Sequence, residues 1–479
     1  MTYHLRLFRI FLALSLALIF PLTASAQSLD SASDLLRQGD YDEAIRQFRE
    51  IAASKSRDAG QACILLGDAL LQTGDMQQAR EAYIKARDKK VNDAYLRLAE
   101  LALLAYNTEL ASDDLELYRK GLGKGRRALP DESGDLEDRI DRISTMLERV
   151  EQLVIIDSIN VDADRFFEYY RLSPESGRLL SPDVLPPSFP RADPTVVYCP
   201  ESGREIIWAA PDADNNFQLV SSICLYGDNW DAPVPLGDVL NEGGDANYPF
   251  LMPDGVTLYF ANDGENSLGG YDIFITRRDG SDFLQPQNLG MPYNSPYNDY
   301  MLAIDESNGI GWWATDRNQI PGEVTIYVFL VSDMRINYPV DSPDLPDRAR
   351  VTSIRDTWKP GADYTPQLRK IAAIRTSAES DDADRSSFVF TLPDGRIVRS
   401  LDGFSSPTAR DAMRQLIVAR AALKSRQARL DALRRTYSGG NFSVAPDITD
   451  LEREILDARR ELRRLSNRVV TLEIPDAAQ

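Results

Sequence analysis

A short acidic loop holds the residues whose types and spacing best suit binding chemistry. It contains Asn262, Asp263, Glu265 and Asn266, and it lies between two expected strands. Carboxylate and amide oxygens are the usual ligands of Ca²⁺, and an exposed polar loop also suits a protein partner. The alternative is a plain connection between strands, because Asn, Asp and Gly are common turn residues. The sequence leaves these interpretations open.

The remaining composition excludes most catalytic chemistry. The one histidine, His4, lies in an N-terminal segment that we expect to be cleaved. Ser-His-Asp sites, Cys-His sites and His-ligated zinc are therefore excluded, and three cysteines cannot supply four thiolates. Carboxylate chemistry remains, such as a glycosidase pair, but 74 Asp and Glu residues are too many to indicate it. We predict a protein that is not an enzyme and has no cofactor.

The N-terminal segment is typical of secretion. Arg6 and Arg9 precede an apolar run over residues 10–21, which is followed by Ala24, Ser25 and Ala26. This order predicts a signal peptide over residues 1–26. The alternative, a retained membrane anchor, fits less well because the run is shorter than the roughly 20 residues of a membrane span. The net charge of −20 argues against a nucleic-acid partner.

Residues 27–155 show a helical repeat. A Gly-Asp pair at Gly39 is followed by Ala44 and Phe48, and the same pattern returns 35 residues later, at Gly74, with Ala79 and Tyr83. Small residues let two helices approach closely, and the glycines suit the turns between them. The pattern resembles tetratricopeptide repeats, which implies a stack of helix pairs that holds a peptide or a partner helix.

The third repeat looks degenerate in sequence. Tyr95, Leu98 and Ala99 fit its first helix, whereas Gly121, Gly123 and Gly125 are expected to interrupt the second. We expect a helix over residues 136–154 to cap the stack, because about three repeats are needed to bury a continuous core. Residues 156–194 then form a connector with possible first strands of the next domain. Its six prolines favour an extended conformation.

A second repeat, with a longer period, covers residues 195–330. Ala209, Ala261 and Ala314 follow aromatic or apolar residues and are 52 and 53 residues apart. In the clearest copy, strands are expected over 248–251, 257–261 and 271–277. This pattern resembles the TolB-type WD40-like (PD40) repeat, which implies a β-propeller domain over 195–405. In such a repeat, Asp254 is expected to stabilise the turn between two strands, and Asp272 is expected to stabilise the start of the third strand.

The number of blades is open. Three copies do not close a ring, so we expect five or six blades, with extra strands from segments 166–180, 351–358 and 387–398. The recurring aromatics have two interpretations. As inter-blade core they fill space, and as surface residues they would be stacking platforms for a sugar. These residues are Trp208, Tyr259, Trp312 and Trp313.

The C-terminal segment, residues 406–479, predicts an antiparallel helical hairpin. Leu416, Leu423 and Leu430 repeat every seven residues, and a capping box at Thr449 and Glu452 is expected to start the second helix. The hairpin is either self-contained or a docking site for the helix of another chain. The expected fold class is thus multidomain α and β, with helical repeats, a β-propeller and a helical hairpin.

The whole architecture resembles a group of Bacteroidota envelope proteins. Some relatives end in an OmpA-like domain, and this chain differs because its tail is a hairpin. The resemblance implies a periplasmic scaffold at the inner face of the outer membrane that binds envelope or outer-membrane proteins. The alternative is a carbohydrate-binding or carbohydrate-active propeller. We also expect no disulfide between Cys199 and Cys224, because an intervening strand separates them by roughly 9.6 Å.

Overall fold

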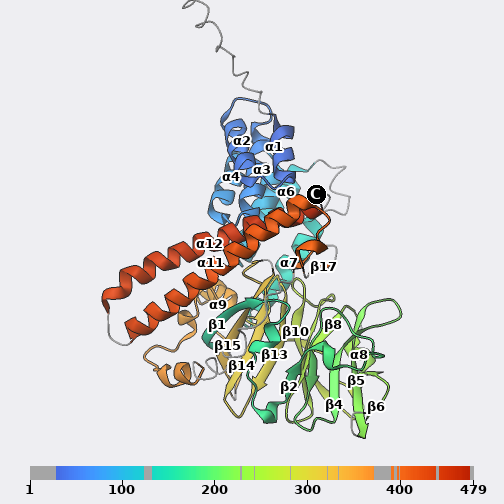
Figure 1. The fold of residues 1–479 in the computed structure, drawn as a ribbon. Helices are drawn as coiled ribbons and strands as arrows, with labels where there is room; N and C mark the ends of the chain where they lie inside the picture. Colours follow the sequence, from blue (N-terminus) through green and yellow to red (C-terminus); the bar gives the residue numbers. More distant parts are fainter. Residues whose placement is uncertain are drawn as a thin grey trace, which may run out of the picture.

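The computed structural model describes most of the chain in three consecutive parts: helices, antiparallel sheets and a helical hairpin (Figure 1). It describes residues 28–122, 132–226, 229–241, 243–280, 282–320, 322–332, 334–371, 390–392, 396–398, 400–438 and 442–474. The expected signal peptide at 1–26, together with Gly123 and Gly125, lies outside the described residues.

The N-terminal part consists of helices that pack in consecutive antiparallel pairs. They are α1 (Leu29–Arg37), α2 (Tyr41–Ala53), α3 (Ala59–Gln72), α4 (Met76–Asp88), α5 (Asp93–Leu104), α6 (Thr108–Gly121) and α7 (Glu132–Leu147). Ala44 and Ala79 are fully buried, and so are Phe48 and Tyr83 in the same apolar cluster. The small residues at these positions do allow close helix approach, as predicted from the repeat.

The third helix pair is complete, which corrects the expected interruption. α6 is continuous to Gly121. The turns of the three pairs are equivalent, because Gly39, Gly74 and Tyr106 all have positive φ angles, of 74°, 82° and 57°. The next residue then caps the second helix: the side chains of Asp40, Asp75 and Asn107 each accept a hydrogen bond from the N–H three residues on. The sequence concealed this repeat because Tyr106 stands where glycine is expected.

The capping helix is shorter than expected. α7 ends at Leu147, and Val154 already begins strand β1 (Val154–Asp162). Leu136, Ile140 and Ile143 of α7 are buried against the third repeat. β1 pairs along its length with β15, so the chain enters the sheet region directly after α7.

Three antiparallel sheets follow. The first sheet has β2 (Arg178–Leu180), β3 (Val197–Cys199), β4 (Glu205–Pro211), β5 (Phe217–Tyr226), β6 (Asn229–Trp230) and β7 (Val234–Pro235). The second has β8 (Ala246–Leu251), β9 (Thr257–Asn262), β10 (Asp272–Asp279), β11 (Asp282–Phe283) and β12 (Gln287–Asn288). The third has β13 (Asp299–Asp305), β14 (Ile310–Thr315) and β15 (Glu323–Leu330), with β1 at its edge. The strands expected in the clearest copy are β8, β9 and β10.

The expected ring of five or six blades is not found in the described residues, where the sheets of four or more strands number three. Segment 166–180 contributes only β2 and the short helices η1 (Phe166–Tyr169) and η2 (Pro174–Ser176). Segment 351–358 holds a short helix, η4 (Arg355–Thr357), after α9 (Leu345–Arg350). β16 (Phe390–Thr391) and β17 (Ile397–Val398) form a separate ribbon.

Other segments cover the outer faces of the sheets, so a neighbouring blade is not needed there. Trp208 of the first sheet stacks on Phe189 with ring centroids 5.6 Å apart, and its Nε1 donates to the carbonyl of Pro190 at 2.8 Å. The proline-rich connector, with η3 (Pro182–Val184), is therefore a cover for this face rather than a free spacer. Burial of Trp208 by a loop removes the same apolar surface from water as a further sheet would.

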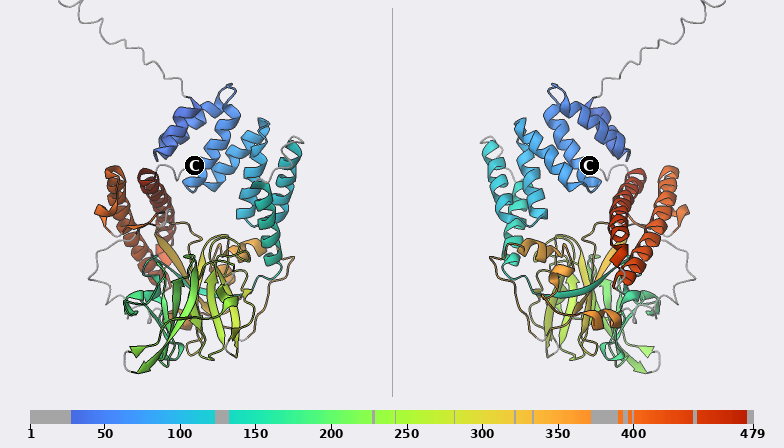
Figure 2. Two further views of the ribbon diagram at one scale, coloured as in Figure 1. Left: turned by 90° about the vertical axis from the view of Figure 1, so that its right-hand side faces the viewer. Right: turned by 90° about the vertical axis from the view of Figure 1, so that its left-hand side faces the viewer.

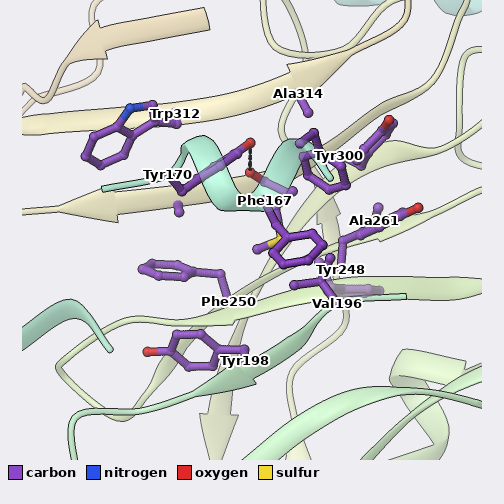
Figure 3. Close-up of a cluster of buried hydrophobic side chains, with 14 of the residues drawn as sticks. Phe167, Tyr170, Val196, Tyr198, Tyr248, Phe250, Ala261, Tyr300, Trp312 and Ala314 are labelled. Carbon is purple, nitrogen blue, oxygen red and sulfur yellow. Dashed lines mark hydrogen bonds between the residues drawn. The ribbon is translucent and has the colours of Figure 1, made fainter. Parts of the chain in front are cut away.

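The outer face of the third sheet is covered in the same way. Tyr170 lies beside Trp312, and its hydroxyl donates to the carbonyl of Met301 at 2.8 Å (Figure 3). Phe166 packs edge-on against Tyr248 and Tyr300 of two different sheets. The η1 segment thus fills the space between β8 of the second sheet and β13 of the third sheet.

The C-terminal hairpin consists of α11 (Pro407–Ser438) and α12 (Ala445–Glu473), preceded by η5 (Leu401–Gly403) and joined by η6 (Phe442–Val444). Leu416, Leu423 and Leu430 share one buried cluster with the apolar residues of α12 and with the β16–β17 ribbon. The expected capping box is wrong. α12 begins at Ala445, with proline in its first turn, and the Thr449 hydroxyl donates to the Ala445 carbonyl inside the helix.

Candidate functional site

The predicted acidic loop connects β9 to β10, and its side chains mainly fix the loop itself. Asn262 is buried, and its Oδ1 accepts a hydrogen bond from the N–H of Gly264 at 2.8 Å. Asp263 Oδ1 accepts from the N–H of Asp245 at 2.7 Å, which joins the loop to the start of β8. Burial raises the pKa of Asp263. These contacts fit the turn interpretation of the two residues.

The second half of the loop contacts the helical repeats. Arg142 of α7 donates through Nη1 to the carbonyls of Glu265 and Ser267, each at 3.0 Å. Asn266 accepts at its carbonyl from Asn288 Nδ2 at 2.9 Å. The loop therefore lies at a junction within the molecule, and an arginine of its own chain binds its backbone.

A hollow of about 580 Å³ opens beside this junction. Two of the four predicted site residues, Asp263 and Glu265, line it, and Asn262 and Asn266 do not. Across from the acids lie two arginines of α7; the full lining is Arg139, Arg142, Gly243, Gly244, Asp263, Gly264, Glu265, Ser267, Leu268, Gly269 and Pro296. Groups of three or more His, Cys, Asp or Glu side chains that could hold a metal ion are absent from the described part of the chain. Partner binding at the loop stays a prediction.

A second hollow, of about 360 Å³, lies among α2, α3 and α4 of the repeats. Leu66 and Leu70 are largely buried at its base, and the exposed side chains of Glu81 and Lys85 stand on its α4 side. The rest of its lining is Arg49, Ala52, Ala53, Gln78 and Ala82. This groove was not predicted from the sequence. The signal was present in the small residues Ala52, Ala53 and Ala82, which leave space between adjacent repeats.

The candidate sugar platforms are not at the surface. Trp208 and Trp313 are 0 % exposed and Trp312 is 3 % exposed, while Tyr259 is partly buried. Trp313 packs against Tyr293 of the second sheet region and Tyr327 of β15. An indole that is covered on both faces cannot stack on a ligand, so these residues act as core.

Two aspartates of the sheet region, Asp254 and Asp272, have the structural roles expected of them. Asp254 holds the turn between β8 and β9, because its Oδ1 accepts from the N–H groups of Val256 and Thr257 at 2.8 Å. Asp272 is fully buried at the start of β10, where its Oδ2 accepts from the Leu268 N–H at 3.0 Å and from Asn288 Nδ2 at 2.6 Å. Its Oδ1 has no hydrogen-bond partner among the residues that the structure describes, and burial raises the pKa of this carboxyl well above its usual range.

A buried arginine lies near Asp272 and was not predicted. Arg317 Nη2 donates to Asp299 Oδ1 at 2.7 Å and to the carbonyls of Pro292 and Tyr293 at 3.1 and 2.6 Å. The side chains of Arg317 and Asp299 are 6 % and 0 % exposed. Such a pair fixes the chain that precedes β13. Sequence alone gave no signal, because Arg317 is one of 54 Lys and Arg residues.

Comparison with known proteins identifies one part of the chain. Residues 29–94 match the tetratricopeptide repeat family, which covers the first two helix pairs and the beginning of α5. No curated protein and no solved structure matches the chain. Tetratricopeptide repeats generally mediate protein–protein interactions, so the match indicates a scaffold for such interactions. Within the described ranges, none of the helices combines the length and hydropathy that crossing a membrane requires.

Proposed function

We propose that this protein is a non-enzymatic scaffold that binds protein partners in the periplasm, at the inner face of the outer membrane. The observation that carries the proposal is the tetratricopeptide match over residues 29–94. The apolar run and small residues before position 27 support secretion, and the architecture resembles that of Bacteroidota envelope proteins. Envelope proteins are therefore the proposed partners.

The groove among α2, α3 and α4 is the proposed contact for a partner segment. It combines an apolar base, Leu66 and Leu70, with charges of both signs at Arg49, Glu81 and Lys85. An apolar base removes partner side chains from water, and the surrounding charges select the register of the partner. The groove is formed by adjacent repeats, so its shape depends on their stacking.

The sheets have a supporting role in this proposal. The recurring sequence motifs resemble the TolB-type propeller, and the three sheets share one buried apolar cluster, which supports a role as the base on which the helical repeats are mounted. No observation favours the carbohydrate alternative, because its four aromatic residues are fully or partly buried.

Two experiments test the proposal. Fractionation of cells that produce the tagged protein should place it in the periplasmic or outer-membrane fraction, and chemical crosslinking in intact envelopes with mass spectrometry should identify linked proteins. Purified protein should hydrolyse nothing in a panel of glycan and peptide substrates. Turnover that is lost on mutation of one carboxylate among the sheets would overturn the non-enzymatic assignment, and a cytoplasmic location would overturn the envelope assignment.

A further inference from the structure

Two very different junctions connect the repeats to the rest of the molecule. The first is mainly apolar, with the hydrogen bonds from Arg142 to the β9–β10 loop beside it. One buried cluster joins Tyr106 and Leu136 of the repeats to Leu268 and Met291 of the sheet region and to Leu345 of α9. Tyr106 is only 4 % exposed, at the third of the equivalent repeat turns. Apolar burial of this kind persists when salt is added.

The second junction is a contact of α12 across the first two repeat turns. Arg464 forms an ion pair with Asp42 at 2.8 Å, and Asn467 Nδ2 donates to the carbonyl of Gln72 at 3.0 Å. The helix passes close to the glycines of both turns: a Cβ atom on Gly39 would lie 3.0 Å from Arg468 Cγ, and one on Gly74 would lie 3.1 Å from Arg463 Nη1. Each turn thus receives one arginine of α12.

This α12 junction is mainly polar, and it includes one buried contact: Tyr41 of α2 is 6 % exposed, and its side chain forms a hydrogen bond with Thr471 of α12. The buried apolar clusters of the repeats and of the hairpin share no member among the described residues. The ion pair is also open to solvent, with Arg464 and Asp42 side chains 35 % and 77 % exposed. The Nε of Arg464 is buried and finds no hydrogen-bond partner in the described part of the chain, so the contact is incompletely satisfied there. Such an exposed ion pair gains little free energy and is screened by salt.

Charge favours the docking over a longer range. Residues 407–474 contain fourteen Lys or Arg and nine Asp or Glu, a net charge of +5. The whole chain has −20, so the remainder has −25. The hairpin is therefore a basic element on an acidic body, and ions in solution weaken their attraction.

The hairpin also contacts the third sheet, through arginine side chains. Arg463 Nη2 donates to the Asn318 carbonyl at 2.9 Å. Arg420 lies against Gly322, where a Cβ atom would be 2.4 Å from its Nη2. Burial raises the pKa of Glu323, and the charges of Arg420 and Arg459 partly offset this shift. Buried charges are screened much less than exposed ones. Figure 2 shows the resulting arrangement, in which the repeats arch from the hairpin on one side to α7 on the other.

We propose that the repeat turns at Gly39 and Gly74 form a docking surface for an arginine-bearing helix, and that α12 occupies it as a latch. Screening of the charges opens the latch, while the apolar junction at Tyr106 keeps the repeats attached. The hairpin remains on the third sheet. This regulation goes beyond the proposed partner binding, and it holds or fails independently of any partner.

The test measures a distance across the latch in the purified full-length chain. Spin labels are placed at Lys55→Cys, between α2 and α3, and at Leu456→Cys on the exposed side of α12, with Cys224→Ser to prevent labelling there. Pulsed electron resonance then gives the distance distribution at about 0.05 M and about 0.5 M salt, which spans strong and weak Coulomb interaction. At low salt we expect one narrow distribution of distances between the two labels. At high salt we expect this distribution to be replaced by longer distances.

Matched variants separate the latch from a general charge effect. Arg464→Glu with Arg468→Glu should open the latch at low salt. Arg453→Glu with Arg460→Glu changes the same charge on the same helix and should leave the latch closed. Among the described residues, these two arginines form ion pairs with Asp450 and Asp457 of α12 and not with the repeats. A charge swap, Asp42→Arg with Arg464→Asp, should restore the closed distance.

The outcomes decide the proposal. A second label pair, Leu225→Cys and Leu456→Cys, should keep its distance in salt, because the hairpin stays on the sheets. An unchanged Lys55–Leu456 distance at both salt concentrations would overturn the latch, as would opening of the control variant to the same extent. If circular dichroism shows that the Arg464 variant does not fold, the salt dependence of the label distance in the chain without the charge substitutions still tests the proposal.

Discussion

At the scale of single residues, the polar groups buried between the sheets determine how stability responds to pH. Asp272 has its pKa raised first by burial and then by the nearby Asp299 carboxylate. A raised pKa in the folded state means that folding favours the protonated form. The stability it contributes is therefore complete below the unfolded pKa of about 4 and is lost as pH rises through the folded pKa.

We predict that Asp272→Asn flattens this pH dependence. The amide keeps an acceptor for the Leu268 N–H and carries no charge, so the variant should match the parent protein near pH 4 and be more stable at pH 8. Urea denaturation at pH 4, 6 and 8 measures the free energy of unfolding of the variant and of the parent protein. A variant that is less stable than the parent at pH 8 would show that the ionised carboxylate is favourable in the fold.

A second residue-scale prediction concerns Tyr106. Tyr106→Ala should lower the free energy of unfolding by about 3 kcal/mol, because a buried ring is removed from a cluster that spans two domains. Calorimetry should then resolve separate transitions for the repeats and the sheets. Tyr106→Phe keeps the ring and is the control; an equal loss with Phe would mean that packing of the ring is not the cause.

Single residues were predictable only where local chemistry fixes them. Asp254 could be placed in its turn because Asp-Gly pairs bond their own backbone. Arg317 and Tyr106 could not, since their partners lie far away in sequence and nothing in their type indicates burial. The acidic loop was located correctly between two strands, but its contact with Arg142 depends on how the repeats sit on the sheets.

At the scale of elements, the recurring aromatic position of the second strand is structural. Phe260 is 3 % exposed, so Phe260→Ala should cost about 3 to 5 kcal/mol of unfolding free energy. Leu225, at 61 % exposure, provides a control, and Leu225→Ala should change stability by less than about 0.5 kcal/mol. A loss below about 1 kcal/mol for Phe260→Ala would contradict the assigned strand face.

The cysteines test the strand order. Cys199 lies in β3 and Cys224 in β5, with β4 between them, and no disulfide joins them. Mass spectrometry of the unreduced, alkylated protein should find no linked peptide pair, because neighbouring strands are about 4.8 Å apart and two such steps exceed disulfide reach. A linked pair would refute this order of strands.

Periodicity predicted the elements well and their ends less well. The repeat glycines and the heptad leucines located helices correctly, and the strands of the clearest copy were found within two residues. Errors arose where an unexpected residue type took over a known position. Tyr106 replaced a turn glycine, and proline in the first turn moved the start of α12 ahead of the apparent capping box.

At the scale of the whole molecule, the arrangement of the parts could not be predicted. The proline-rich connector, which was expected to be extended, covers a face of the first sheet. The hairpin contacts both the repeats and the third sheet through arginines, and such polar contacts leave no periodic signal. The modules could therefore be predicted from the sequence, whereas the contacts by which each module touches the other two are visible only in the structure.

The central claim is that the groove of the helical repeats binds protein partners. The most direct measurement places a photo-crosslinking amino acid at Lys85, on the groove, or at Leu225, an exposed position on the first sheet, and illuminates intact cells. We predict protein adducts from position 85 that disappear when Glu81→Arg is added, and none from position 225. Adducts from position 225 with none from position 85 would contradict the claim.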